Sequence, residues 1–157
     1  MTFERTEDWA LVKSIITHPR IYSHMGDDSA ISREMWEPQK NEAIWYITVR
    51  DEGELMGLFI FFPENSVCWQ VHVALLPIGW GKKAIEAFED CIRWVFKNTA
   101  CERIVGSVPM WHFPAMRLAR AAGLVEYGIN KASHLKKKRL HDQILFGISK
   151  RDLAWES

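Results

Sequence analysis

The stretch from Val71 to Ala84 contains the residue types and spacing that best suit the binding of an anionic ligand. An apolar segment with one histidine, His72, leads through Pro77 into a turn with two glycines, Gly79 and Gly81, and then into a helical pattern. Glycines allow the backbone to approach a phosphate, and the first N–H groups of a helix point at it with the positive end of the helix dipole. Two lysines at the start of the helix add positive charge. The pattern predicts an anion cradle, and its alternative is a strand-to-helix turn in which glycine serves only close packing.

Other reactive side chains lack a recognised motif. Ser66, Ser107 and Cys68 do not lie in a G-x-S-x-G elbow or in another nucleophile motif. Cys68 and the two other cysteines, Cys91 and Cys101, form an odd set without the spacing of a disulfide framework or of a zinc site. We therefore expect no metal, no hydrolase chemistry and a reducing compartment.

Length and composition are those of an ordinary globular chain. The 157 residues suit one domain, 1–157, and 48% of them are hydrophobic while 25% are charged. The formal net charge is zero, so no global field would draw the molecule to nucleic acid or to an anionic membrane. The N-terminus lacks an apolar signal core, and no window approaches the roughly 20 apolar residues that span a bilayer. We expect a cytoplasmic protein without a membrane or nucleic-acid partner.

Helical periodicity of the apolar residues predicts four helices. The third, which begins at Gly81, has the clearest apolar stripe of the chain. The helices are expected from Thr6 to Pro19, from Ser29 to Trp36, from Gly81 to Lys97 and from Pro114 to Gly123. The segment between the first two, with His24, Met25, Asp27 and Asp28, is expected to form a loop.

Runs of β-branched and aromatic residues predict six strands. Ile44–Val49 and Leu55–Phe62 flank a turn at 51–54 and indicate a hairpin. Val67–Leu75 is nearly apolar on both faces, which predicts a central place in the sheet. The remaining strands are expected at Arg103–Val108, Leu124–Ile129 and Gln143–Ile148. This order of helices and strands is typical of an α+β fold.

The anion cradle resembles the pyrophosphate loop of the GNAT superfamily of acyl-CoA-dependent N-acyltransferases. In that family a long strand ends in a proline and continues through Q/R-x-x-G-x-G/A into a helix. With Gly79 and Gly81 as the two glycines, Leu76 replaces the Gln or Arg. Aligned from Pro77 instead, Gly81 becomes the first glycine and Lys83 replaces the second. Both alignments use the same backbone amides, and the first keeps the apolar residues of the helix on its buried face.

The second half of the chain adds to this resemblance. The family pattern N-x-x-A/S-x-x-L-Y-x-x-x-G-F corresponds to His112, Ala115, Leu118, Ala119, Gly123 and Leu124. The resemblance covers Ile44 to Lys150, and the closing segment Asp142–Ser149 also looks like divergent GNAT-like proteins of bacteriophages and prophages. It implies the GNAT fold, an α/β sandwich of the α+β class with a mixed, mostly antiparallel central sheet flanked by helices.

The resemblance also implies acetyl-CoA or CoA as the cofactor, bound where the strands at 67–75 and 103–108 splay apart. An amine acceptor would attack the thioester directly. The implied cofactor-binding residues are Val73, Ala74, Leu75 and Leu76 at the pantetheine arm, Gly79, Trp80, Gly81, Lys82 and Lys83 at the pyrophosphate, and Ala115 in the following helix. The protein would then mainly position the reactants and supply a base and an acid.

Two histidines are the candidate catalytic residues. His72 lies on the central strand, and an imidazole titrates near neutral pH, so it is the first candidate base; a buried histidine bonded to backbone is the alternative. His112 replaces a family asparagine, and could bind cofactor or relay a proton, or else only pack at the helix start. Ala119 stands where many family members place a tyrosine as the acid, and alanine cannot donate a proton.

The run Lys136–Arg139, flanked by His134 and His141, is predicted in the connection between the last two strands. Recognition of an acidic acceptor, of a CoA phosphate or of nucleic acid is one interpretation. A solvated loop is the other, and the neutral net charge favours it. The eight tryptophans are expected to pack in the core rather than to stack on a ligand.

The leading hypothesis is an N-acyltransferase with acyl-CoA and an unidentified amine as its partners. The alternative is a GNAT-folded protein without catalysis, acting as a binding or assembly factor in a phage particle and located in the host cytoplasm. The absent tyrosine and the imperfect loop would suit it. A nucleic-acid-binding module built on the basic run is a third hypothesis, and a homodimer is left open.

Overall fold

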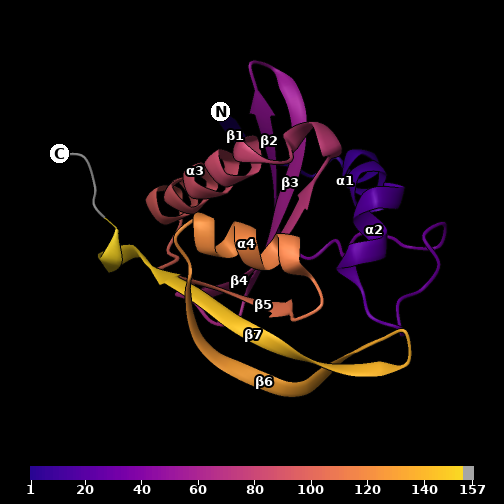
Figure 1. The fold of residues 1–157 in the computed structure, drawn as a ribbon. Coiled ribbons are helices and arrows are strands. Elements are labelled where there is room, and N and C mark those ends of the chain that lie inside the picture. Colours follow the sequence, from indigo (N-terminus) through magenta and orange to yellow (C-terminus); the bar gives the residue numbers. More distant parts are fainter. Residues whose placement is uncertain (154–157) are drawn as a thin grey trace.

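Within residues 1–153, which the computed structural model describes, seven strands form one mixed sheet in the order β1-β2-β3-β4-β5-β7-β6 (Figure 1). All neighbours pair antiparallel except β4 and β5, which are parallel. The strands are β1 (Thr2–Arg5), β2 (Trp45–Asp51), β3 (Glu54–Pro63), β4 (Cys68–Leu75), β5 (Arg103–Pro109), β6 (Val125–Lys136) and β7 (Arg139–Ser149). The expected α+β class with a mixed, mostly antiparallel sheet is confirmed.

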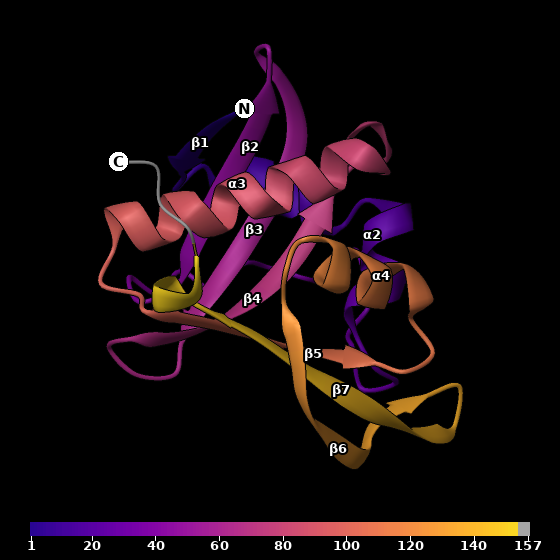
Figure 2. The ribbon, with the colours of Figure 1, turned by 60° about the vertical axis from the view of Figure 1, so that its left-hand side comes forward.

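In the same part of the chain, four α-helices cover the two faces of the sheet (Figure 2). They are α1 (Trp9–Ile16), α2 (Pro19–Met25), α3 (Lys82–Asn98) and α4 (Phe113–Ala121), and short 3₁₀ turns lie at Pro77–Gly79 and Lys150–Asp152. Helices α3 and α4 share one apolar cluster with one face, and α1 and α2 share a second cluster with the other. Among the described helices, none has the length and apolar character needed to cross a membrane.

Helix α3 is firmly packed in the core and so fixes the position of the loop at residues 76–81 that precedes it. Its predicted apolar stripe is buried, with Ala84, Phe88, Cys91, Ile92 and Val95 in the core. The ring of Phe88 stacks on Phe59 of β3 with the ring centroids 5.5 Å apart. Burial of one such large apolar side chain stabilises a fold by about 1.5–3 kcal/mol. The helix ends where the Thr99 amide donates to the Val95 carbonyl at 3.0 Å.

The second helix lies earlier in the chain than the sequence pattern predicts. The expected helix at Ser29–Trp36 is wrong, because those residues form turns, and the expected loop before residue 26 is helical. Proline has a fixed φ and no N–H, so Pro19 suits the first turn of a helix as well as it ends one. The imidazole of His18 caps the new helix, since its Nδ1 accepts a hydrogen bond from the Arg20 amide at 3.1 Å.

Strand β1 is absent from the sequence-based expectation, because its four residues are mostly polar and show no buried pattern. It exists through pairing with β2, where Phe3 lies opposite Val49. The guanidinium of Arg5 lies over the ring of Trp45, 3.9 Å from the centroid, and fixes the strand end. The pairing with β2, and not the local sequence, therefore determines that these residues form a strand.

The two parallel strands separate after three paired positions. Their last pair is Gln70 with Val105, yet β4 continues to Leu75 and β5 to Pro109. Strand β3 accompanies β4 to its end, and β7 accompanies β5. From Val71 onward, one edge of β4 therefore lacks a strand partner within residues 1–153. The predicted splay is present, and it opens the sheet at its centre.

The hairpin of β6 and β7 is longer than predicted and is fastened at its tip. Lys137 and Lys138 form the turn with φ of 52° and 61°, and the carboxylate of Asp28 accepts both of their amides at 2.8 Å. The ammonium of Lys136 donates to the Ser23 and Gly26 carbonyls at 2.9 and 3.0 Å. Part of the basic run is thus structural, because it ties the hairpin to the C-terminal end of α2.

Candidate functional site

A cavity of about 430 Å³ lies where β4 and β5 separate. The two strands, the α2 end, helix α4 and the β6–β7 hairpin all contribute to its wall. It is lined by His24, Met25, Gly26, Asp27, Val71, His72, Val73, Phe88, Gly106, Ser107, Val108, Pro109, His112, Ala115, Leu118, Ala119, Leu124, His134, Gln143 and Phe146. The separation of β4 and β5, which long-range strand pairing determines, therefore creates a cavity with room for a small ligand.

The structure brings four of the sequence-predicted residues together in this cavity. They are His72, Val73, His112 and Ala115. The side chains of Ala74 and Leu75 are buried in the core instead. Residues 76–83 lie outside the cavity wall, at the end of β4 and the start of α3. Strand β4 thus runs from the cavity to the predicted cradle and connects the two sites.

The cradle offers fewer open amides than its sequence suggests. The amides of Gly79 and Trp80 donate to the loop's own carbonyls, and the Leu76 amide donates to Met56 of β3 at 2.9 Å. The next three amides, those of Gly81, Lys82 and Lys83, have no acceptor within residues 1–153. They belong to the N-terminus of α3, where an anion is favoured by both the N–H groups and the helix dipole.

Gly81 gives the cradle its shape. Its φ is 77° and its ψ is −138°, a backbone conformation that L-residues rarely adopt, and a Cβ there would meet nothing within 4 Å. Open space therefore lies in front of the three amides. The Lys83 ammonium is paired with the Asp51 carboxylate at 3.2 Å, while Lys82 has no ion pair in the described chain.

His72 is not sealed in the core. Its imidazole is exposed toward the cavity, it forms no hydrogen bond with the described residues, and its nearest ring contact is the edge of Phe62, 5.2 Å away. The surrounding protein nevertheless desolvates it, and this burial lowers the pKa of His72. The ring is thus neutral at pH 7 and has a nitrogen able to accept a proton. A backbone-bonded structural histidine does not fit this environment.

His112 belongs to a group of rings that the sequence analysis did not assemble. It stacks on His24 with centroids 5.1 Å apart and on Trp111 at 5.0 Å, and Trp111 lies 5.9 Å from His134. The four rings come from α2, from the α4 start and from β6, so no local pattern could group them. Burial, together with the nearby charges of His24 and Lys136, lowers the pKa of His112 to about 4.

Among the described residues, no tyrosine, cysteine or lysine lines the cavity wall to protonate a leaving thiolate. Ala119 is buried and lines the cavity, and alanine has no titratable group. The cysteines are unsuited to act as nucleophiles, because burial raises the pKa of Cys101 to about 12 and raises those of Cys68 and Cys91 as well. The groups that could exchange a proton at this cavity are the imidazoles, the Ser107 hydroxyl and water.

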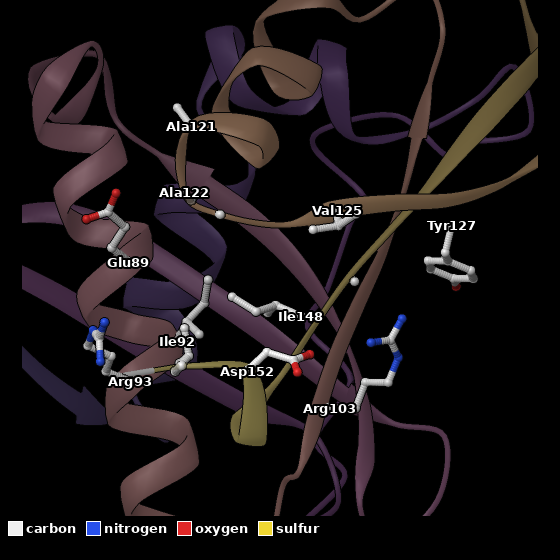
Figure 3. A pocket seen from close by; sticks show the side chains of 13 residues that line it. Glu89, Ile92, Arg93, Arg103, Ala121, Ala122, Val125, Tyr127, Ile148 and Asp152 are labelled. Carbon is white, nitrogen blue, oxygen red and sulfur yellow. The ribbon is translucent and has the colours of Figure 1, made fainter. Parts of the chain in front are cut away.

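A second cavity, of about 640 Å³, lies between α3 and the outer strands (Figure 3). Arg103 and Tyr127 flank it; the guanidinium lies 5.2 Å from the tyrosine ring centroid and donates to the Ser149 hydroxyl at 3.0 Å. None of the sequence-predicted site residues lines this cavity. Although it is larger, it has no connection to the β4 edge or to the cradle, so the smaller cavity is the candidate site.

Comparison with known proteins finds likeness in structure. No protein-family model matches the sequence, and no curated protein does. A spermidine N-acetyltransferase from Vibrio cholerae, solved with CoA and spermine, aligns with a TM-score of 0.77 and 18% identity over 96% of this chain and 95% of that one. A GNAT-family acetyltransferase from Bacillus anthracis aligns with a TM-score of 0.73 and 16% identity, over 96% and 95%. A ribosomal-protein-S5-alanine acetyltransferase from Vibrio fischeri aligns with a TM-score of 0.68 and 17% identity, over 96% of this chain and 93% of that one. The fold of this chain is that of the GNAT acyltransferases.

Proposed function

We propose that this protein is an N-acyltransferase that transfers an acyl group from acyl-CoA, with acetyl-CoA as the donor, directly to an amine. The observation that carries the proposal is the continuity of β4. Its unpaired edge borders the cavity at residues 71–73, and its end leads into three open amides at Gly81, Lys82 and Lys83. An extended ligand with a phosphate at one end and a reactive group at the other suits that path.

The residues present fit CoA. A pyrophosphate would be held by the amides at the α3 N-terminus, next to the open space at Gly81. The amide and carbonyl of Val73 face the cavity, because backbone groups alternate along a strand and the Leu76 amide points the other way, to β3. Val73 would therefore pair with the pantetheine arm. The chemistry that the bound cofactor supplies is an acyl group activated as a thioester.

The chain's own part is positioning and proton transfer. His72 faces the cavity as a neutral imidazole, so it can accept the proton that the acceptor ammonium must lose. His112 lies at the α4 start on the same cavity and is neutral too, which suits a relay to solvent. The apolar side chains of Val71, Leu118 and Phe146 in the wall limit water around the reacting atoms. With Ala119 in the wall, the leaving thiolate takes its proton from water.

A binding or assembly factor with this fold, encoded by a phage and without catalysis, is the competing function. Ala119 in place of a tyrosine favours it. Both functions are compatible with CoA binding, and turnover separates them.

The experiment that tests the proposal measures binding first and turnover second. Acetyl-CoA at about 100 times its dissociation constant should stabilise the native state by about 2.7 kcal/mol and raise the melting temperature. Thiol release from acetyl-CoA in the presence of mixed amine acceptors then reports transfer. No heat of binding and no melting shift with acetyl-CoA, CoA or longer acyl-CoAs would reject the acyltransferase, and binding without any turnover would favour the competing function.

A further inference from the structure

The acceptor end of the cavity has an unusual balance of charge. Its wall contains four histidines, one carboxylate and no lysine or arginine. The carboxylate is Asp27, in the loop after α2. Its Oδ1 accepts hydrogen bonds from the Ser29 amide at 2.9 Å and from the Ser29 hydroxyl at 2.5 Å, and these bonds lower the pKa of Asp27. A single ionised carboxylate therefore stands at the edge of the cavity.

The other charges near this end disfavour a second cation. Burial lowers the pKa of His72, His112 and His134, so these rings are neutral at pH 7. The Lys136 ammonium lies 5.4 Å from the Trp111 ring centroid and bonds to carbonyls at the end of α2, so its positive charge is fixed beside the four-ring group. A ligand with several ammonium groups would find Asp27 as the one carboxylate of the cavity wall. The nearby Asp28 carboxylate is already bonded to the amides of Lys137 and Lys138, and the Lys136 charge opposes a second cation.

Two buried polar atoms at this end have no partner among the described residues. They are Nε2 of His134, which lines the cavity, and Nε1 of Trp111, whose ring lies 5.9 Å from that of His134. An indole N–H can only donate, whereas an imidazole nitrogen donates or accepts according to its tautomer. Buried polar groups in native proteins are nearly always paired, so the His134 nitrogen, on a residue of the cavity wall, points to a ligand with its own hydrogen-bonding group, whereas Trp111 does not line the cavity. A peptide unit has both a carbonyl and an N–H.

We propose that the acceptor is a single α-amino group on a neutral, hydrogen-bonding body, as at the N-terminus of a peptide, rather than a polyamine. The inference rests on the proposed acyltransferase function. Asp27 attracts the one ammonium, and His134 pairs with the first peptide unit. The solved Vibrio cholerae enzyme, crystallised with CoA and spermine, shares the fold, so a polyamine is the comparison acceptor for this proposal.

The chemistry of the amine supports the same class. An α-ammonium has a pKa of about 8, whereas a lysine-like alkylammonium has one of about 10.4, so an imidazole deprotonates the former far more readily. His72 or water takes the proton, the neutral nitrogen attacks the thioester carbonyl, and the C–N bond forms as the C–S bond breaks. The nitrogen, which is positively charged after the attack, loses its second proton to water, and the thiolate takes a proton from water. The products are the N-acylated peptide and free CoA.

The test compares acceptors with the full-length protein and acetyl-CoA. The probes are lysine-free tripeptide amides with varied first residues, an N-blocked peptide with one lysine, spermidine and spermine. We expect kcat/KM for the best α-amine to exceed that for spermidine and for the lysine peptide by about 10-fold or more, read as thiol release. Equal or faster transfer to a polyamine would overturn the inference, as would the lack of transfer to every peptide by protein that binds acetyl-CoA. Failure to bind acetyl-CoA would instead reject the proposed function itself.

A matched pair of variants tests the role of the carboxylate. Asp27→Asn keeps an oxygen for the Ser29 hydrogen bonds and removes only the charge. We expect it to raise KM for the peptide about 10-fold with unchanged CoA affinity. Glu86→Gln, which removes an exposed charge on α3, should leave both constants unchanged. An unchanged KM in Asp27→Asn would show that the ammonium binds elsewhere and would overturn this assignment.

Discussion

The indole Nε1 of Trp80 donates a hydrogen bond to the carbonyl oxygen of Leu75, 2.7 Å away, at the end of β4. That carbonyl faces away from β3, because the next residue, Leu76, points its amide to Met56 of β3. Trp80 stands between the two glycines of the cradle, and the guanidinium of Arg20 lies 4.9 Å from its ring centroid. The side chain therefore occupies the strand edge along which an extended cofactor would pair.

Trp80→Phe should strengthen CoA binding. Phenylalanine keeps a ring but has no N–H, so the Leu75 carbonyl becomes open to a ligand. A net hydrogen bond is worth about 0.5–1.5 kcal/mol, so affinity should rise about 2- to 10-fold while the melting temperature falls. Calorimetric titration with CoA measures the effect, and Trp94→Phe, on the far side of α3 against Phe3, serves as the control. Weaker binding in Trp80→Phe would show that the indole contacts the ligand instead.

Gly81→Ala should lose both stability and CoA affinity. A Cβ at this position meets no atom within 4 Å, so the damage comes from φ of 77° alone, at a cost of about 1–3 kcal/mol. Gly53 in the β2–β3 turn is a matched control, because its φ is 83° and its Cβ would also meet nothing. Chemical denaturation should show similar losses in both alanine variants. Only Gly81→Ala should bind CoA more weakly, and equal affinities would move the anion site elsewhere.

His72→Gln should slow acyl transfer while CoA affinity stays near wild type. General-base groups contribute about 100- to 10,000-fold, which is roughly 3–5 kcal/mol of transition-state stabilisation. Because burial lowers the pKa of His72, the wild-type rate should rise with pH through an apparent pKa below 6.5 and be level at neutral pH. Single-turnover transfer across pH is the measurement. If the folded His72→Gln variant kept the wild-type rate and pH profile, water or His112 would be the proton acceptor.

His112 should make the fold sensitive to acid. Its pKa is about 4 in the native protein and about 6.5 in an unfolded chain, so below pH 6.5 the unfolded state binds the extra proton. The stability linked to the neutral ring is complete above pH 6.5 and is lost as the pH falls toward 4. Because the ring is partly exposed and solvent screens it, urea unfolding at pH 7 and pH 4.5 should show the wild type losing about 1–2 kcal/mol more than His112→Asn. Parallel losses in both proteins would mean that this imidazole is protonated in the native state.

Lys136→Met should destabilise the protein, and Lys138→Met should not. The Lys136 ammonium donates to two carbonyls at the α2 end and lies over Trp111, contacts worth about 1–3 kcal/mol together. The side chain of Lys138 is exposed, and only its backbone amide bonds to Asp28. Thermal unfolding of the two variants gives the comparison. Equal melting temperatures would show that the hairpin tip is held by Asp28 alone.

Local sequence determines several elements of this protein, because their signals lie within a few residues of each other. The apolar stripe of α3 repeats at helical spacing, and one face of β4 carries the apolar run Trp69, Val71, Val73 and Leu75, as expected for a strand inside the sheet. The turn at 51–54 and the glycine at 81 need backbone conformations that few residues adopt. The order of the elements from β2 onward, and with it the fold class, could therefore be predicted from the sequence, whereas β1 and the position of α2 could not.

The cavity and its rings depend on contacts between distant segments. The point at which β4 and β5 part is set by β3 and β7, which hold each strand on its outer side. His24, Trp111 and His134 meet only because Asp28 and Lys136 fasten the hairpin tip to the end of α2. Strand β1 forms only beside β2, and Pro19 begins a helix because His18 caps it. Periodicity and turn chemistry are local properties that the sequence displays directly. The register of the strands and the packing of helices and hairpins against one another depend on the free energy of the whole chain, so only the tertiary structure could decide them.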